Sequence, residues 1–238
     1  MFDFPWEQAT GCKTCEDMLG VCGKKADTAE LRDKLTGALI GLARATEGND
    51  HVVSDSTAAT IVEGLFATLV FDNDALLAIM DRVDAEKRKL VPECYNCTSS
   101  CGRNNDYDMQ NLWNAQEDIR SLKSLILCGV RGIGTYAYHA AALGYKDESI
   151  HKFLYRALFA IGMDDWGMDE LLPIVLEVGE VMLKCMAMLD KANTETFGHL
   201  GKQNFRPGST LPAFISPNVL NALVEKRKIA PIAAPEKI

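Results

Sequence analysis

The sequence predicts an all-α protein: an antiparallel helical bundle with a short irregular C-terminal tail. Apolar residues recur at the three- and four-residue spacing of a helix through most of the chain, and no period-two alternation of any length occurs before residue 205. The apolar segments are long and their connections short, which favours helices that pack antiparallel to their neighbours.

The expected helices follow in order. The first starts at Asp27, with Glu30 three residues later as in a capping box, and ends at Gly48. Further helices are expected over residues 57–69, 74–90, 112–143, 149–161 and 168–189. Pro92 closes the third helix, and a polar loop is expected at 91–108. The stretch 171–189 is the most apolar, but it contains charged residues, so we expect a buried helix and not a membrane span.

Composition divides the chain into three predicted parts. Residues 1–27 form a cysteine-containing N-terminal metal-binding segment, residues 28–196 the helical bundle, and residues 197–238 a linker and C-terminal tail in which glycine and proline recur.

The charge balance excludes some partners. The chain has 33 acidic and 25 basic residues, for a formal net charge of −8. An acidic surface argues against nucleic acid or an anionic membrane as the main partner. The first residues show no basic region followed by an apolar core, so no secretory signal is predicted and the expected compartment is the cytoplasm.

Cysteine spacing carries the strongest chemical signal. Six of the eight cysteines form two clusters, C-x2-C-x6-C and C-x2-C-x3-C, and we predict that all six bind a metal cofactor: Cys12, Cys15, Cys22, Cys94, Cys97 and Cys101. Thiolates select soft metals. Three thiolates with one remote ligand suit an iron–sulfur cluster of the 4Fe-4S type, whereas zinc, the alternative, prefers two C-x2-C pairs on one ion.

The remaining chemistry-bearing residues are interpreted structurally. Cys128 and Cys185 lie in apolar helical stretches and are expected to be buried small hydrophobes. Gly129, Gly132 and Gly134 follow no strand, so they predict close helix packing and not a nucleotide site. His139, Glu177 and Glu180 are expected to be packed or solvated. No catalytic residue is predicted, because neither a hydrolytic triad nor a phosphate-binding loop is present.

Several segments carry a family resemblance. They are residues 1–2, 7–8, 10–12 (TGC), 20–24 (GVCGK), 64–69 (GLFATL), 129–132 (GVRG), 153–158 (FLYRAL), 177–187 (EVGEVMLKCMA), 193–199 (NTETFGH) and 211–219 (LPAFISPNV). The chain resembles the hybrid cluster proteins, the hydroxylamine reductase or prismane family. The first nine segments are similar to the start of that family and its N-terminal helical domain, and the last to its extreme C-terminal end.

The chain differs from the family pattern in two ways. The family's central α/β domains, which hold the ligands of its hybrid cluster, have no counterpart here, so the resemblance implies the family and not its activity. The family binds a cubane through four N-terminal cysteines, and Asp3 and Trp6 stand at the first two of those positions. The cubane is then expected on Cys12, Cys15 and Cys22, with a fourth ligand from the second cluster or weakly from Asp3. Alternatively, each cysteine cluster holds its own centre.

The leading functional prediction is an iron–sulfur redox protein that transfers electrons. A reductase of hydroxylamine or nitric oxide acting with a partner subunit is the first alternative, and a zinc-stapled or metal-free helical scaffold is the second. In the family, the helical domain packs against the central domains. We therefore expect one bundle face to be covered by a redox partner protein or by self-association.

Overall fold

The computed structural model describes residues 25–47, 54–90 and 106–197, and these ranges form helices without a β-strand. The helices are α3 (Ala26–Glu47), α4 (Asp55–Ala67), α5 (Asn73–Leu90), α6 (Met109–Trp113), α7 (Glu117–Ala142), α8 (Glu148–Gly162) and α9 (Met168–Phe197). The all-α fold class predicted from the sequence is therefore confirmed.

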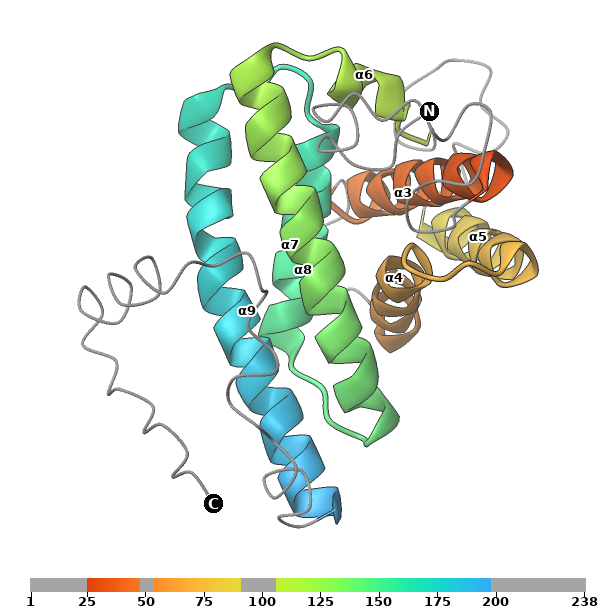
Figure 1. The fold of residues 1–238 in the computed structure, drawn as a ribbon, viewed down its shortest axis with the longest axis vertical. Helices are drawn as coiled ribbons and strands as arrows, with labels where there is room; N and C mark the ends of the chain where they lie inside the picture. The colour runs from red at the N-terminus through yellow and green to blue at the C-terminus, as the bar shows by residue number, and fades with distance from the viewer. Residues whose placement is uncertain (1–24, 48–53, 91–105, 198–238) are drawn as a thin grey trace, which may run out of the picture. The chain divides into compact units, whose positions relative to one another are not determined.

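The helices form two neighbouring groups of three. Helices α7, α8 and α9 run side by side in alternating directions, and α3, α4 and α5 lie against them (Figure 1). Helix α3 packs on α5 and α8, while α4 packs on α5 and α7. The short helix α6 connects the two groups.

The core lies where the two groups meet. Leu35 and Leu39 of α3, Leu65 of α4, Ile133 of α7 and Leu158 of α8 are all fully buried. They belong to a single apolar cluster with contributions from all seven helices. One core thus holds both groups together, and removing this apolar surface from water is its main source of stability.

The start of α3 differs from the expected capping box. The helix begins at Ala26, and Asp27 turns outward to a neighbour: its Oδ2 accepts a hydrogen bond from Asn73 Nδ2 at 3.0 Å. Thr28 Oγ1 donates to Asn73 Oδ1 at 2.8 Å. Glu30 pairs with Lys34 at 2.8 Å instead of closing the cap. These polar groups therefore join the start of α3 to the start of α5.

The helix expected from residue 112 is divided in two. Helix α6 ends at Trp113, and the Gln116 side chain accepts hydrogen bonds from the backbone of Asp118 and Ile119 at 3.1 and 3.3 Å. This side chain satisfies amides that a helix start leaves without partners. A new helix, α7, therefore begins at Glu117 and not five residues earlier.

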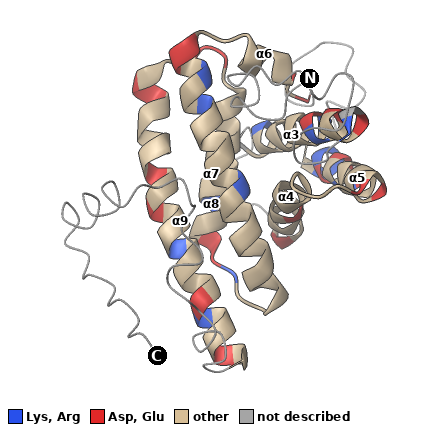
Figure 2. Cartoon of the chain, in the orientation of Figure 1, with Lys and Arg blue, Asp and Glu red and all other residues tan. Residues whose placement is uncertain are grey.

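Helix α9 is longer and more exposed than expected. It continues past Leu189 to Phe197, and Ala192, seven residues after Cys185, is buried on the same side of the helix. The interpretation of 171–189 as a buried helix holds for one side alone, since Leu176 on the other side is 67% exposed. Figure 2 shows that charged residues are widely spaced along α9 and that most of α7 is uncharged.

The glycines of α7 do bring helices together, as the sequence predicts. A Cβ at Gly129 would collide with Val178 of α9, and one at Gly132 would lie 2.7 Å from the end of the Met182 side chain. These glycines lie inside a helix, and the described residues contain no strand before them. The close approach of α7 and α9 thus depends on the missing side chains.

The chain divides into two compact units, residues Met1–Ala192 and Asn193–Ile238, and the arrangement above concerns the first. Of the second unit, the structure describes residues 193–197, which form the end of α9. The three domain ranges predicted from the sequence remain predictions. Within the described ranges, no helix combines the length and the apolar character needed to cross a bilayer.

Candidate metal centre and the helices beside it

The six cysteines of the predicted metal centre, Cys12, Cys15, Cys22, Cys94, Cys97 and Cys101, lie outside the described residues. The structure does describe where their segments join the bundle. Helix α3 starts at Ala26, four residues after Cys22, and α5 ends at Leu90, four residues before Cys94. These junctions fix how far each cysteine can lie from the bundle.

Tyr107, the second described residue after the second cysteine cluster, is held against α3. Its backbone N–H donates to the Gly37 carbonyl at 3.0 Å, and its side chain is 3% exposed. A Cβ at Gly37 would collide with the Tyr107 carbonyl oxygen. The chain can therefore pass this close to α3 because residue 37 has no side chain.

An ion pair holds the preceding residue to α5. Lys87 in the last turn of α5 pairs with Asp106, and its side chain is 5% exposed whereas that of Asp106 is 52% exposed. The buried ammonium requires a partner, because an unpaired charge inside a protein is strongly destabilising. Both ends of the segment that carries Cys94, Cys97 and Cys101 thus attach to one helix.

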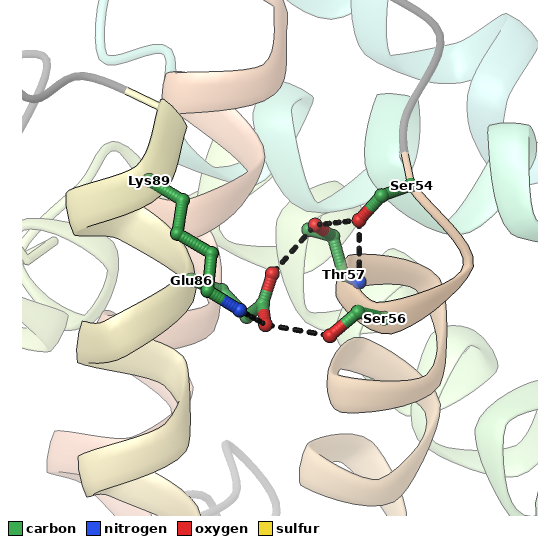
Figure 3. A network of polar contacts seen from close by, with 5 residues as sticks. All are labelled: Ser54, Ser56, Thr57, Glu86 and Lys89. Carbon is green, nitrogen blue, oxygen red and sulfur yellow. Dashed lines mark hydrogen bonds and ion pairs between the residues drawn. The ribbon is translucent and has the colours of Figure 1, made fainter.

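Glu86, the neighbour of Lys87, joins α5 to the start of α4 (Figure 3). Its two carboxylate oxygens accept hydrogen bonds from Ser56 Oγ at 2.7 Å and Thr57 Oγ1 at 2.9 Å. Lys89 Nζ donates to the carboxylate at 2.7 Å. Burial alone raises the pKa of Glu86, but hydrogen bonds from Lys89, Ser56 and Thr57 outweigh burial and leave the pKa below its ordinary value. The Glu86 carboxylate is therefore ionised, and both of its oxygens accept hydrogen bonds from the start of α4.

A second polar cluster surrounds the Tyr107 side chain. Its hydroxyl donates to Asp164 Oδ1 at 2.8 Å, and Lys123 Nζ lies 3.3 Å from the same oxygen. The Arg44 guanidinium lies 5.0 Å from the Tyr107 ring centroid. Burial lowers the pKa of the fully buried Lys123, although Asp164 opposes the shift, and burial with the Asp164 hydrogen bond raises the pKa of Tyr107. The phenol therefore stays protonated and donates to the carboxylate.

The two cysteines within the described ranges, Cys128 and Cys185, belong to no cluster of metal-ligand side chains there. Cys185 is buried, and its Sγ donates to the Ile133 carbonyl at 3.5 Å; burial raises its pKa to about 11. Burial also raises the pKa of the half-buried Cys128. Burial therefore disfavours the thiolate form at both positions. No group of three His, Cys, Asp or Glu side chains in the described ranges could hold a metal ion.

A separate cavity of about 340 Å³ lies between α4, α7 and α8. It is lined in part by Asp55, Glu63, Tyr138, Lys146 and His151. Burial lowers the pKa of His151, and Lys146 lowers it further, so the imidazole is neutral at pH 7. The lining is mixed in charge and mostly apolar, and it does not favour one class of ligand.

A family comparison matches most of the chain. The model of the Prismane/CO dehydrogenase family matches residues 7–206. The chain belongs to the Prismane/CO dehydrogenase family. The resemblance found in the sequence motifs is thereby confirmed.

Curated relatives of this prismane-family chain are named hydroxylamine reductases. One from Caldanaerobacter subterraneus subsp. tengcongensis is 37% identical over 227 residues, which cover 84% of this chain and 40% of the relative. One from Methanococcus vannielii is 34% identical over 213 residues, covering 81% and 38%. One from Porphyromonas gingivalis is 37% identical over 221 residues, covering 84% and 40%. The chain thus spans about 40% of the length of the relatives it matches.

Several buried, charged residues of this prismane-family chain were not predicted from the sequence. Glu86, Lys87 and Lys123 occur in segments that read as ordinary amphipathic helix, and their burial depends on which neighbour covers them. Gly37 carried a weak signal, because a glycine inside a helical pattern often marks a close approach. His139, in contrast, is exposed and contacts the Phe66 and Tyr138 rings, as the structural interpretation expected.

Proposed function

We propose that this chain is an iron–sulfur redox protein whose cluster is bound by Cys12, Cys15 and Cys22 with a ligand from Cys94, Cys97 or Cys101. The chemistry of the donor set supports an iron–sulfur cluster, since six thiolates in two short clusters suit a soft metal centre. Family membership supports it further, because the resemblance to hybrid cluster proteins implies a cubane in the N-terminal part of the chain. When bound, such a cluster supplies single-electron transfer.

The observation that carries the proposal is that both cysteine-bearing segments adjoin helix α3. The first segment leads into the start of α3, and the end of the second is hydrogen-bonded to it. Tyr107 lies against Gly37, eleven residues after the start of α3 at Ala26, which is about 17 Å along the helix axis. Four residues of extended chain reach about 14 Å from Ala26 to Cys22, and six reach about 20 Å from Tyr107 to Cys101. The two reaches together exceed the separation of their attachment points. The chain lengths therefore permit both clusters to supply ligands to one centre.

The described residues have a supporting role in this proposal. Lys87 with Asp106, and Tyr107 with Gly37, fix one end of the second cysteine segment, and Glu86 fixes the adjoining start of α4. Rigid attachment reduces the conformational entropy lost when distant ligands converge on one centre.

Metal analysis with matched cysteine variants tests the proposal. We expect anaerobically purified full-length chain, reconstituted with iron and sulfide, to contain about four irons and four sulfides if the clusters share one centre, or about eight of each if they bind two. Cys22→Ser and at least one of Cys94→Ser, Cys97→Ser and Cys101→Ser should lose visible absorbance and the EPR signal of the reduced protein, whereas Cys128→Ala should retain both. Absence of acid-labile sulfide in the wild-type chain would refute the proposal, and one bound zinc in a colourless protein would favour the zinc-stapled scaffold.

A second function is favoured by the names of the relatives. Since the curated relatives that we compare are named hydroxylamine reductases, this chain could contribute to reduction of hydroxylamine together with a partner subunit. A reduced viologen dye as electron donor tests this directly. Turnover of hydroxylamine by the purified chain would favour the reductase, and no turnover by a protein that contains its cluster would favour electron transfer.

A further inference from the structure

Helix α9 is anchored firmly at its start. Leu171 and Ile174 are buried in the apolar core. Asp164, in the connection that precedes the helix, accepts hydrogen bonds from Tyr107 and Asn111 at 2.8 and 3.1 Å. Burial and hydrogen bonding therefore both attach the beginning of α9 to the rest of the bundle.

Residues 175–192 of α9, which we call the distal segment, bury much less. Cys185 and Ala192 are the two buried residues of this segment, and both side chains are small. Val178 and Met182 pack on the core but remain partly exposed. Apolar stabilisation grows with the area removed from water, and an element with few buried contacts opens at a lower free energy than the core. The distal segment is therefore the part of α9 that separates most readily.

Pro173 lies between the anchored start of α9 and the distal segment. Proline has no N–H to donate inside a helix, and its ring crowds the carbonyl four residues earlier, here that of Asp169. Proline is accordingly a usual site at which a helix bends sharply. A weak point of the helix thus coincides with the position where burial decreases.

Two ion pairs attach the distal segment to α8. Glu177 pairs with Arg156, and Lys184 pairs with Asp147 at the start of α8 at 2.8 Å. The four side chains are between 29% and 50% exposed, so water and salt screen both pairs. The attachment of the distal segment to α8 is therefore sensitive to ionic strength.

We propose that the distal segment detaches from α7 and α8 as a unit, with a hinge at Pro173, while the rest of the bundle stays folded. The motion breaks both ion pairs and exposes Cys185, whose side chain is fully buried and donates to the Ile133 carbonyl of α7 when the segment is attached. Higher salt weakens the ion pairs and favours the open arrangement. This conformational device does not depend on the proposed metal centre, since every residue that it uses lies in the helical bundle.

Alkylation of Cys185 by iodoacetamide measures the opening, because a buried thiol is inert until it is exposed. The full-length chain is labelled at mildly alkaline pH, and peptide mass spectrometry separates Cys185 from the other cysteines. We expect the labelling rate to rise with urea at less than about half of the slope of global unfolding, followed by circular dichroism, since the slope scales with the surface exposed. Equal slopes would show that only global unfolding exposes Cys185, and would overturn the proposal.

Charge variants test the attachment to α8. Lys184→Gln and Glu177→Gln should each raise the labelling rate of Cys185 about two- to fivefold, because each removes a partly exposed ion pair. Lys152→Gln is the matched control: it makes the same charge change as Lys184→Gln, but Lys152 pairs with Glu148 within α8. This variant should be labelled at the wild-type rate, and an increase equal to that of Lys184→Gln would contradict the role of the interhelical pairs.

Pro173→Ala distinguishes a hinged segment from fraying of the helix end. Alanine restores the missing N–H and strengthens the helix at this point, so the labelling rate of Cys185 should fall at least about twofold. Fraying from the C-terminal end would expose Cys185 before it reached Glu177 or Pro173. Labelling that neither Pro173→Ala nor Glu177→Gln changes would therefore overturn the hinge.

Discussion

Tyr107 and Gly37 show how one residue can position a segment that begins far away in the sequence. The Tyr107 amide and carbonyl lie against α3 at a point where any side chain would block them. The phenol of the same residue reaches Asp164 in the connection between α8 and α9. A single residue thus ties the end of the cysteine-bearing segment to both groups of helices.

Gly37→Ala should therefore destabilise the chain. The new methyl group meets a backbone carbonyl that cannot move without breaking the Tyr107–Gly37 hydrogen bond, so we expect the free energy of unfolding to fall by about 1–3 kcal/mol. Gly132→Ala is the control, because its nearest contact is the movable end of the Met182 side chain at 2.7 Å. Denaturant unfolding of both variants measures the difference, and an equal effect would contradict the role assigned to Tyr107.

At the residue scale the sequence identified the glycines of α7 but not the buried cations. Gly129 and Gly132 lie in a helical pattern where the absence of a side chain has few uses other than close packing. Lys123 lies in an equally regular pattern, yet it is fully buried because Tyr107 and Asp164 arrive from other parts of the chain. Helical spacing cannot reveal a partner that is brought by tertiary packing.

Asp147 connects two elements, because it begins α8 and also binds α9. Its side chain accepts a hydrogen bond from the Ser149 amide at 2.9 Å and pairs with Lys184 at 2.8 Å. Burial alone raises the pKa of Asp147, but hydrogen bonds from Lys184 and Ser149 outweigh burial and lower the pKa from 3.8 to about 2. The carboxylate is thus a cap and an interhelical ion-pair partner at once.

Asp147→Asn should change how stability depends on pH. A pKa that is lower in the folded chain stabilises the fold above the unfolded pKa, and this contribution is lost as the pH falls from about 4 to about 2. Asparagine keeps the cap but has no charge, so the variant should be less stable at pH 7 and should lack this part of the acid transition. Equilibrium unfolding between pH 2 and pH 7 measures both effects.

The control for this prediction is Glu148→Gln. Glu148 pairs with Lys152 four residues later, and both side chains are more than 70% exposed. Exposed pairs of this kind contribute little to stability. If Glu148→Gln altered the acid transition as much as Asp147→Asn, the effect would come from general charge and not from the link between α8 and α9.

Element boundaries were predicted well where a local signal defines them. The ends of α5 and α8 follow the sequence closely, since apolar spacing stops just before Pro92 in one case and at a turn in the other. The start of α7 depends on the Gln116 side chain, and the extension of α9 past Leu189 includes the buried Ala192. Neither is a standard sequence signal, because a glutamine cap and a single buried alanine are recognised only in the folded chain.

At the scale of the whole molecule, we expect the bundle and the proposed metal centre to be separable. Within the described ranges, the apolar core is built from residues of α3 to α9, whereas the six candidate ligands, Cys12, Cys15, Cys22, Cys94, Cys97 and Cys101, lie outside those ranges. Small metal domains without such a core unfold when the metal is removed. This chain has an extensive apolar core within its described ranges.

We therefore expect the chain to stay folded without its cofactor. A variant with all six candidate ligands replaced by serine should keep the far-ultraviolet circular dichroism spectrum of the wild type and a cooperative thermal transition, with a lower unfolding temperature. Loss of helical signal in this variant would show that the metal organises the bundle, and would contradict the separation of core and centre.

The sequence by itself determined the helical class, most helix boundaries, the family, and the cysteine pattern on which the proposed centre rests. These properties depend on local spacing or on short motifs, which are present in the chain before it folds. Tertiary structure alone decided that Lys87 and Lys123 are buried, that Gly37 receives Tyr107, and that α9 keeps an exposed apolar side. Each of these depends on which surface a helix turns toward its neighbours, and that choice is made by packing across distant segments.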